Sequence, residues 1–362
     1  MDTTVTATPL MTVAACAENG AVRLESRPRP EPGPGEMVLR LRAAGLCGTD
    51  LFKLRYATAP AGTVLGHEVV GTVAALGEGV VGFGLGDRVV VPHHVACGEC
   101  DLCRRGSEPA CPAFRENLLA PGGFSEWVLV RERAVRRAAF GLPPALADES
   151  AVFLEPAACV LRGIRHARLA ETAPSPGCAA ILGAGGMGLL HLLVLAAVHP
   201  TLRVMVSDPL EERLDLALKL GADAVAAPES AGRELALLSG GRGADAVFDT
   251  AGGNGPLEAA LALTRPGGAV VLFAHAAAGE RAAFDLNAFF KSERRLLATY
   301  SSGLAEQREV YRLLVSGRLD PSPLVTHRLP LSRFAAAVEL ARDRQAVKVL
   351  LVPDAGQGGE HA

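Results

Sequence analysis

The sequence is poor in aromatic residues and in lysine. Of its 362 residues, 4% are aromatic and only four are lysine, so arginine supplies nearly all of the positive charge. Leucine, valine and alanine must therefore fill the hydrophobic core. The net charge is −3 and the arginines are scattered along the chain. Because this distribution offers no basic stripe for phosphates, we expect no nucleic-acid partner.

The sequence also lacks an apolar run long enough to cross a bilayer, and it shows no signal peptide. A membrane span needs about 20 apolar residues, whereas the longest run here contains His191 and ends at Pro200. The segment 5–17 has no basic start and is interrupted by Pro9. Four of the eight cysteines lie within 15 residues, which is not typical of a secreted disulfide framework. We therefore predict a cytoplasmic protein with no membrane partner.

The length of the chain and the change in its residue pattern predict two domains. A chain of 362 residues exceeds one typical core, and its 49% hydrophobic content is that of a globular protein. In the first third of the chain, apolar and polar residues alternate as they do in β-strands, and strands are expected at 37–43, 69–76, 87–91 and 123–130. From about Asp148 the pattern becomes helical, and after Pro176 strands and helices take turns, which predicts a parallel, doubly wound sheet. Further strands are expected at 179–182, 204–206, 246–249, 269–273, 296–300 and 347–352, with helices at 210–220, 256–264, 305–316 and 332–342.

A glycine-rich loop follows the first strand of the alternating part. The apolar run 179–182 leads into Gly183, Gly185 and Gly188, which have the spacing GxGxxG, and a long apolar run follows. These glycines would allow a tight turn, close approach of a pyrophosphate to the backbone, and close packing of the next helix. The N-terminus of that helix would favour the negative charge of the pyrophosphate. The alternative is an ordinary glycine turn of an α/β protein.

Asp208 supports the dinucleotide interpretation. It ends the next apolar run, 204–206, and lies 20 residues after Gly188. A carboxylate at that distance can accept hydrogen bonds from both ribose hydroxyls and repels the additional phosphate of NADP. We therefore predict a dinucleotide site that prefers NAD.

Four cysteines predict a structural metal site. Cys97, Cys100, Cys103 and Cys111 follow one another at intervals of three, three and eight positions, and glycines and prolines provide the bends of the loop. Four thiolates at such spacings can surround one zinc ion tetrahedrally and leave no open position. Disulfides and an iron site of the rubredoxin type are the alternatives.

A second set of potential metal ligands is dispersed along the chain. Cys47, His67 with the adjacent Glu68, and Glu155 together suit a zinc ion with an open position. Taken singly, Cys47 is also compatible with a core thiol, His67 with a turn, and Glu155 with the start of a helix.

The order of these motifs resembles a known family. The sequences Cys-Gly-Thr-Asp, Gly-His-Glu, Gly-Asp-Arg-Val, the four-cysteine loop, Gly-Gly-Phe-Ser-Glu and the glycine loop follow one another in the chain. This arrangement is similar to the zinc-containing medium-chain alcohol dehydrogenases and covers residues from about 13 to 352. Glu155-Pro156 resembles the sorbitol and threonine dehydrogenase branch, in which a glutamate stands where other members have a third catalytic cysteine.

The resemblance implies an α/β fold of two domains, a GroES-like, β-rich catalytic domain and a Rossmann NAD-binding domain. The expected boundaries are 1–160 for the first part of the catalytic domain, 161–303 for the nucleotide domain, 304–352 for the return to the catalytic domain, and 353–362 for a disordered tail. The resemblance also implies a homodimer or a homotetramer.

The resemblance assigns roles to individual residues. It implies that Cys47 and His67 ligate a catalytic zinc, that Glu68 ligates it directly or through water, and that Glu155 approaches the metal or its water. Thr49 would take the proton of the substrate. Cofactor contacts are implied for Gly183, Gly185, Gly186, Met187, Gly188, Asp208 and Arg213, and the nicotinamide half would lie near Thr250, Phe273 and Ser301.

Phe52 is the one clear departure from the family pattern. Many relatives have a histidine there that passes the substrate proton to solvent, which a phenyl ring cannot do. The other histidines, including His93 and His94, are expected to be structural, and Cys16, Cys159 and Cys178 to be core thiols. Substrate-determining side chains are expected around 50–60, 115–120 and 275–300, with Phe52, Arg115, Glu116 and Asn117 as candidates.

These features together predict an enzyme with two zinc ions per subunit, one catalytic and one structural. It would transfer a hydride between a secondary alcohol and NAD. A polyol, sugar alcohol or cyclitol is the favoured small-molecule substrate, and an amino alcohol such as threonine is the alternative. Zinc-free reductases with this fold lack the ligand set, and a non-enzymatic binding protein would show an eroded site.

Overall fold

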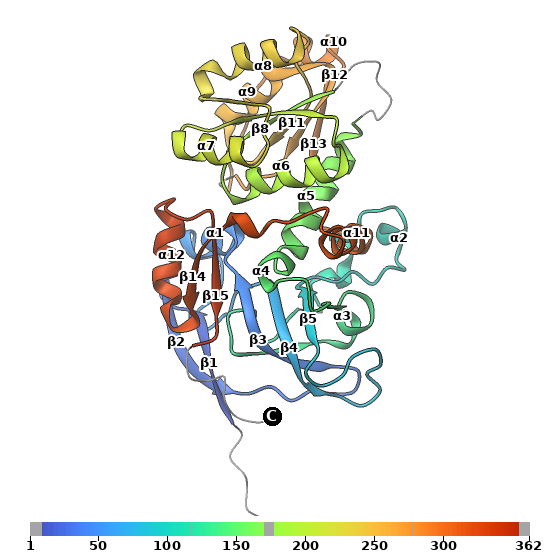
Figure 1. Ribbon diagram of the computed structural model, residues 1–362, viewed down its shortest axis with the longest axis vertical. Helices are drawn as coiled ribbons and strands as arrows, with labels where there is room; N and C mark the ends of the chain where they lie inside the picture. The colour runs from blue at the N-terminus through green and yellow to red at the C-terminus, as the bar shows by residue number, and fades with distance from the viewer. Residues whose placement is uncertain (1–8, 117, 170–176, 277, 355–362) are drawn as a thin grey trace, which may run out of the picture. The chain divides into compact units, whose positions relative to one another are not determined.

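Two structural units make up the chain in the computed structural model, which describes residues 9–116, 118–169, 177–276 and 278–354. Unit 1 consists of Met1–Glu155, Gly303–Val315 and Val325–Ala362, and unit 2 of Pro156–Ser302 and Ser316–Leu324. Unit 1 is therefore assembled from three separate stretches of sequence. Figure 1 shows this as blue, cyan and red ribbon within the same unit.

Unit 1 is built on a largely antiparallel sheet with the strand order β14-β15-β3-β4-β5-β7, in which β6 also pairs with β3. Its strands are β3 (Met37–Gly45), β4 (Glu68–Leu76), β5 (Arg88–Pro92), β6 (Trp127–Val130), β7 (Phe140–Gly141), β14 (Val325–Pro330) and β15 (Lys348–Val352). A separate hairpin is formed by β1 (Leu10–Cys16) and β2 (Val22–Pro28). The helices of this unit are α1 (Gly48–Arg55), α2 (Asp101–Arg104), α3 (Glu132–Arg137), α4 (Asp148–Ala151), α11 (Leu304–Val315) and α12 (Phe334–Arg342).

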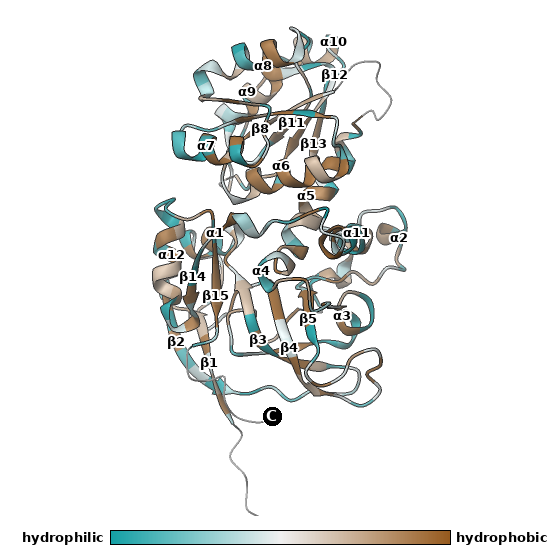
Figure 2. Ribbon diagram, viewed as in Figure 1, coloured by the Kyte–Doolittle hydropathy of each residue, from teal (hydrophilic) through white to brown (hydrophobic). Residues whose placement is uncertain are grey.

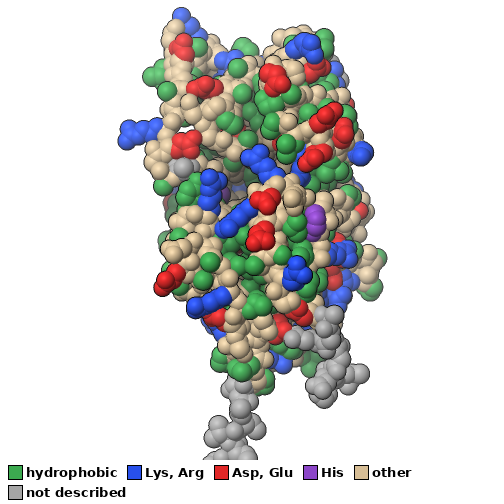
Figure 3. All heavy atoms as spheres, turned by 90° about the vertical axis from the view of Figure 1, so that its left-hand side faces the viewer, with side chains coloured by type: hydrophobic (Ala, Val, Ile, Leu, Met, Phe, Trp, Pro, Cys, Tyr) green, Lys and Arg blue, Asp and Glu red, His purple; other side chains and the backbone are tan. Residues whose placement is uncertain are grey.

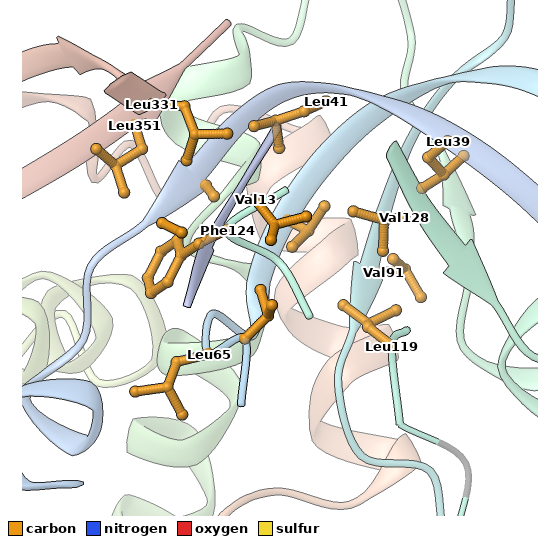
Figure 4. Packing of buried hydrophobic residues seen from close by; sticks show 14 of the residues in the cluster. Val13, Leu39, Leu41, Leu65, Val91, Leu119, Phe124, Val128, Leu331 and Leu351 are labelled. Atoms are coloured by element: carbon orange, nitrogen blue, oxygen red, sulfur yellow. The ribbon is translucent and has the colours of Figure 1, made fainter. Parts of the chain in front are cut away.

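The core of unit 1 is packed around Phe124. Its ring is fully buried and lies among Val13, Leu65, Leu331 and Leu351, as Figure 4 shows. Leu331 and Leu351 come from the last part of the chain, whereas Val13 comes from β1. Because aliphatic side chains from both ends pack on one ring, the C-terminal segment is an integral part of this core.

Unit 2 contains a six-stranded parallel sheet with the order β10-β9-β8-β11-β12-β13. Its strands are β8 (Cys178–Leu182), β9 (Arg203–Ser207), β10 (Ala224–Ala226), β11 (Ala244–Asp249), β12 (Thr264–Leu272) and β13 (Arg295–Ala298). Its helices are α6 (Gly186–Val198), α7 (Glu211–Lys219), α8 (Ala231–Ser239), α9 (Asn254–Leu263), α10 (Leu286–Lys291) and all but the first two residues of α5 (Leu154–Ala167). This is the strand order of the Rossmann fold, which binds dinucleotides where the order reverses, at the carboxyl ends of the central strands. The predicted fold class is confirmed.

The helices of unit 2 differ in polarity according to how much of their surface is covered. In α6 most side chains are buried, and Figure 2 shows this helix brown along most of its length. In α7 only Arg213 and Ala217 are buried, and the helix is largely teal. The uniformly apolar α6 therefore belongs to the interior, as expected of the helix that follows the glycine loop.

The structure differs from the sequence predictions mainly at short or edge elements. The hairpin of β1 and β2 and the strand β14 were not predicted. In the predicted strand 123–130, only 127–130 forms β6, and the segment 123–126 has bends and an isolated bridge from Ser125 to Val13. Of the tail predicted at 353–362, Asp354 accepts a hydrogen bond from the backbone of Ser332 at 3.2 Å, and residues 355–362 lie outside the described part of the chain.

Among the described residues, no helix combines the length and apolarity that a membrane span requires. On the face drawn in Figure 3, acidic and basic side chains are interspersed.

Candidate active site and nucleotide loop

The ends of two paired strands bring the dispersed metal-ligand candidates together. Gly45, at the end of β3, pairs with Glu68, at the start of β4. Cys47 follows β3 by two residues and His67 precedes β4 by one, so antiparallel pairing makes them neighbours. A sulfur of Cys47, a ring nitrogen of His67 and a carboxylate oxygen of Glu68 all lie within 4.8 Å of one another.

Two glycines give these residues the space they need. Gly66 has φ +91°, and a Cβ there would lie 2.8 Å from the backbone nitrogen of Phe124. At Gly45 a Cβ would lie 1.9 Å from the Glu68 carboxylate. A larger residue at either position would displace His67 or Glu68.

Asp50 contacts both Cys47 and His67. Its carboxylate is fully buried in the first turn of α1 and accepts a hydrogen bond from the Cys47 backbone N–H at 3.1 Å. Its other oxygen lies 3.4 Å from His67 Nδ1. A carboxylate against one ring nitrogen of a histidine orients the other nitrogen for a metal.

The charges of this group are mutually compensating. Burial alone would lower the pKa of His67, but the facing Asp50 and Cys47 raise it well above its ordinary value. Burial alone would raise the pKa of Asp50, but His67 lowers it. A cation is therefore favoured between these donors, and a thiolate, an imidazole and a carboxylate form a suitable donor set for zinc.

Glu68 is paired with Lys348, a residue that the sequence analysis did not single out. The Lys348 ammonium forms an ion pair with Oε2 of Glu68, and the two side chains are 7% and 0% exposed. Burial alone would lower the pKa of Lys348, but Glu68 raises it above its ordinary value. The available signal was a lysine at the start of the apolar run 347–352, in a chain with only four lysines.

His93 also lies closer to this group than its sequence context indicated. Its ring centre is 5.9 Å from that of His67 and 4.2 Å from that of His94, which stacks on Phe114. Burial lowers the pKa of His93 well below its ordinary value and that of His94 to about 3, so both imidazoles are neutral near pH 7. The Nδ1 atom of His93 is buried and has no hydrogen-bond partner among the described residues.

The other predicted residues of this region lie in α1, in α5 or outside the described residues. Thr49 is partly buried in the first turn of α1, and Glu155 lies in the first turn of α5, outside the group formed by Cys47, His67 and Glu68. The ring of Phe52 packs on Tyr56 at 4.7 Å. Asn117 lies outside the described residues.

The four cysteines of the loop form a second cluster. The sulfur of Cys103 lies 3.8 Å from that of Cys97 and 3.5 Å from that of Cys100, and the sulfur of Cys111 lies 3.5 Å from that of Cys97. A tetrahedron with zinc–sulfur distances of about 2.3 Å has sulfur–sulfur distances of roughly 3.8 Å. All eight cysteines of the chain are free, so the disulfide alternative does not hold.

Backbone N–H groups support the sulfurs of this loop. Gly98 donates to Cys103 Sγ at 3.3 Å, and Cys100 donates to Cys97 Sγ at 3.4 Å. Backbone donors favour the thiolate, the form that binds a metal. Cys16, Cys159 and Cys178 are buried, as predicted for core thiols.

In unit 2 the glycine loop has the geometry that its spacing predicts. Gly183 has φ +98°, and a Cβ on Gly188 would lie 1.8 Å from the Gly183 carbonyl oxygen. A Cβ on Gly185 would meet no atom within 4 Å, so space remains beside the backbone at the start of α6. Gly183 therefore allows the turn and Gly188 the close packing, whereas Gly185 leaves room for a ligand.

Asp208 follows β9 and faces this loop. Its carboxylate accepts hydrogen bonds from the backbone of Ala184 at 2.7 Å and of Leu210 at 2.9 Å. A carboxylate has about four acceptor positions, so two remain for ribose hydroxyls. Met187 lies in the first turn of α6, and Arg213 is buried in α7. Thr250 and Phe273 follow β11 and β12 at the same edge of the sheet.

Comparison with known protein families shows which family the chain belongs to. Residues 33–139 match the model of the alcohol dehydrogenase GroES-like domain, and residues 186–316 match that of the zinc-binding dehydrogenase. The chain belongs to the zinc-containing medium-chain alcohol dehydrogenase family. As a member of this family it is an oxidoreductase that uses zinc and NAD and acts on a small molecule.

Individual relatives of this medium-chain dehydrogenase differ in the substrate that their names give. L-Threonine 3-dehydrogenase of Pyrococcus horikoshii is 30% identical over 341 residues, covering 89% of this chain and 92% of the relative. Sorbitol dehydrogenase of Bacillus subtilis is 30% identical over 366 residues, covering 95% and 98%. The alcohol dehydrogenase structure of Thermus sp. ATN1 has a TM-score of 0.83 at 30% identity and covers 95% of this chain and 100% of that one.

Proposed function

We propose that the chain oxidises a secondary alcohol of the polyol, sugar-alcohol or cyclitol class with NAD. The observation that carries this proposal is the group formed by Cys47, His67 and Glu68, which has Asp50 behind its histidine. In the overall reaction the alcohol loses a hydride to NAD and a proton to solvent, giving a ketone and NADH. When bound, zinc would polarise the substrate oxygen and NAD would accept the hydride.

The residues of unit 1 would hold the catalytic zinc and move the proton. Cys47 and His67 are the proposed ligands, with Glu68 and Glu155 as carboxylates that approach the metal directly or through water. The Thr49 hydroxyl, in the first turn of α1, would take the substrate proton. Because Phe52 cannot pass that proton on, it would leave through water or the ribose hydroxyls.

The cysteine loop and the glycine loop complete the proposal. Cys97, Cys100, Cys103 and Cys111 would bind the structural zinc. Gly183, Gly185, Gly186, Met187, Gly188, Asp208 and Arg213 would bind the cofactor. The acceptor positions that remain on Asp208 favour NAD over NADP, because a 2′-phosphate would be repelled there.

We further propose that the enzyme is a cytoplasmic homodimer or homotetramer. The free thiols of all eight cysteines support a reducing compartment. The oligomeric state is taken from the family resemblance, and a light-scattering mass in solution tests it.

The test of the function is NADH formation by the purified protein on polyols, cyclitols and threonine, with NAD and NADP compared and zinc assayed on the same sample. We expect turnover of a polyol-like substrate with NAD and two zinc ions per chain. Cys47→Ser should abolish turnover and remove one zinc, whereas the buried thiol variant Cys16→Ser should retain both. Inactivity on every alcohol with only one zinc bound would contradict the proposal.

Threonine is the second candidate because the Pyrococcus relative is as similar as the Bacillus sorbitol dehydrogenase. Arg115 lies close enough to His94 to lower its pKa, after burial and His67, and could pair with a substrate carboxylate. Turnover of threonine that is lost in Arg115→Gln, without turnover of polyols, would select this candidate.

A further inference from the structure

The buried ion pair between Glu68 and Lys348 has a role that the family assignment does not explain. Lys348 is the first residue of β15, and its stem passes over Gly45, where a Cβ would lie 2.9 Å from the lysine Cε. Its ammonium reaches Oε2 of Glu68 and lies 5.4 Å from the centre of the Phe153 ring. Three segments of unit 1 therefore enclose one positive charge beside the candidate metal ligands.

Glu68 faces two cations in competition. A carboxylate oxygen of Glu68 lies within 4.8 Å of the Cys47 sulfur and of a His67 ring nitrogen, and its Oε2 also contacts Lys348. Apart from this ion pair, neither carboxylate oxygen has a hydrogen-bond partner among the described residues. A fully buried carboxylate needs a positive partner, so without the lysine it would be drawn to the metal.

We propose that Lys348 is a positioning residue that holds the Glu68 carboxylate and keeps it from becoming a permanent ligand of the metal bound by Cys47 and His67. Two consequences follow for the proposed function, on which this inference rests. A coordination position stays open for the substrate oxygen, as a catalytic zinc requires. The metal also keeps more of its positive charge, because one fewer anion is bound to it directly, and it polarises that oxygen more strongly.

Cobalt substitution tests this proposal without turnover. Cobalt(II) absorbs visible light more weakly when its coordination number rises above four, so an additional carboxylate ligand is visible in the spectrum. The protein is loaded with cobalt, and the spectrum of the Cys47→Ala variant, which reports the four-cysteine site, is subtracted. In Lys348→Met we expect the absorbance per cobalt of the remaining component to fall several-fold. We also expect its metal to be lost to a chelator about tenfold more slowly, since a freed anionic ligand binds the metal.

The double variant separates this role from a structural one. Lys348→Met with Glu68→Gln removes both charges, so the pair no longer leaves an uncompensated carboxylate, and its spectrum should return to that of the unmodified protein. Lys219→Met, which removes an exposed lysine of α7, should leave the spectrum unchanged.

Three outcomes would overturn the inference. An unchanged spectrum in Lys348→Met, faster metal loss in that variant, or the same change in the double variant would each show that the lysine only packs. If the unmodified protein bound no cobalt at Cys47 and His67, the proposed function would fail together with this inference.

Discussion

At the scale of single residues, Asp50 contacts two proposed ligands of the candidate metal site without being a proposed ligand itself. It hydrogen-bonds the backbone of Cys47 and lies against Nδ1 of His67, so one side chain fixes two proposed ligands. Both contacts come from a carboxylate that is fully buried. A change there acts on metal binding through orientation and charge.

Asp50→Asn is therefore expected to weaken zinc binding about 10–100-fold. The amide can still accept a hydrogen bond from Cys47, but it no longer supplies the negative charge that faces His67. Competition with a zinc chelator measures the change in affinity. Asp87→Asn removes a carboxylate that accepts from Gly84 in an exposed turn, and it should leave zinc affinity unchanged. Equal affinities of the two variants would show that Asp50 does not orient His67.

Asp208 governs the choice of cofactor by the same kind of local interaction. Asp208→Ser should lower kcat/KM for NAD about 10–100-fold, because hydrogen bonds to a charged group contribute about 1.5–3 kcal/mol. The substitution should also reduce the preference for NAD over NADP. Asp215→Ser, on the exposed side of α7, is the control. Steady-state kinetics with NAD and with NADP measure these changes. An unchanged ratio of kcat/KM for NAD to kcat/KM for NADP would contradict the role of Asp208.

At the scale of elements, the approach of α6 to the loop before it depends on Gly188. A Cβ there would meet the Gly183 carbonyl oxygen at 1.8 Å, so the helix would have to move. Gly188→Ala is expected to destabilise the protein by about 1–3 kcal/mol and to weaken NAD binding.

Gly232→Ala provides the matched control for this prediction. Gly232 lies within α8, and a Cβ there would meet no atom within 4 Å. This substitution should stabilise the protein by up to about 1 kcal/mol, because alanine favours the helix. Chemical denaturation measures both changes, and equal effects of the two substitutions would refute the packing argument.

Elements with a local signature were predictable from the sequence, whereas those defined by partners far along the chain were not. The glycine loop, the apolar strands β8 and β9 and the cysteine loop carry their spacing within a few residues. The hairpin of β1 and β2 has exposed and irregular positions, and it is held in part by bonds such as that from Ala14 to Phe124. Lys348 stood out in the sequence only as a lysine within an apolar run, and its contact with Glu68 could not be predicted because it depends on pairing with a strand from the other end of the chain.

At the scale of the whole molecule, the two metal sites should differ in how easily they lose their ions. The four sulfurs around the proposed structural site close it, whereas the site at Cys47 and His67 has an open position. A chelator is therefore expected to remove activity and one zinc ion before the melting temperature falls. Parallel assays of zinc, activity and thermal unfolding follow the two events. A melting temperature that fell in step with activity would contradict this order.

The three-part composition of unit 1 also has a consequence for synthesis on the ribosome. Most of unit 2 is one continuous stretch, so it can fold as soon as it emerges, whereas unit 1 needs β15, which is made last. Until Lys348 emerges, Glu68 has no counter-charge from that strand. A chain that is released early would therefore have an incomplete sheet in unit 1 and a Glu68 carboxylate without its lysine partner.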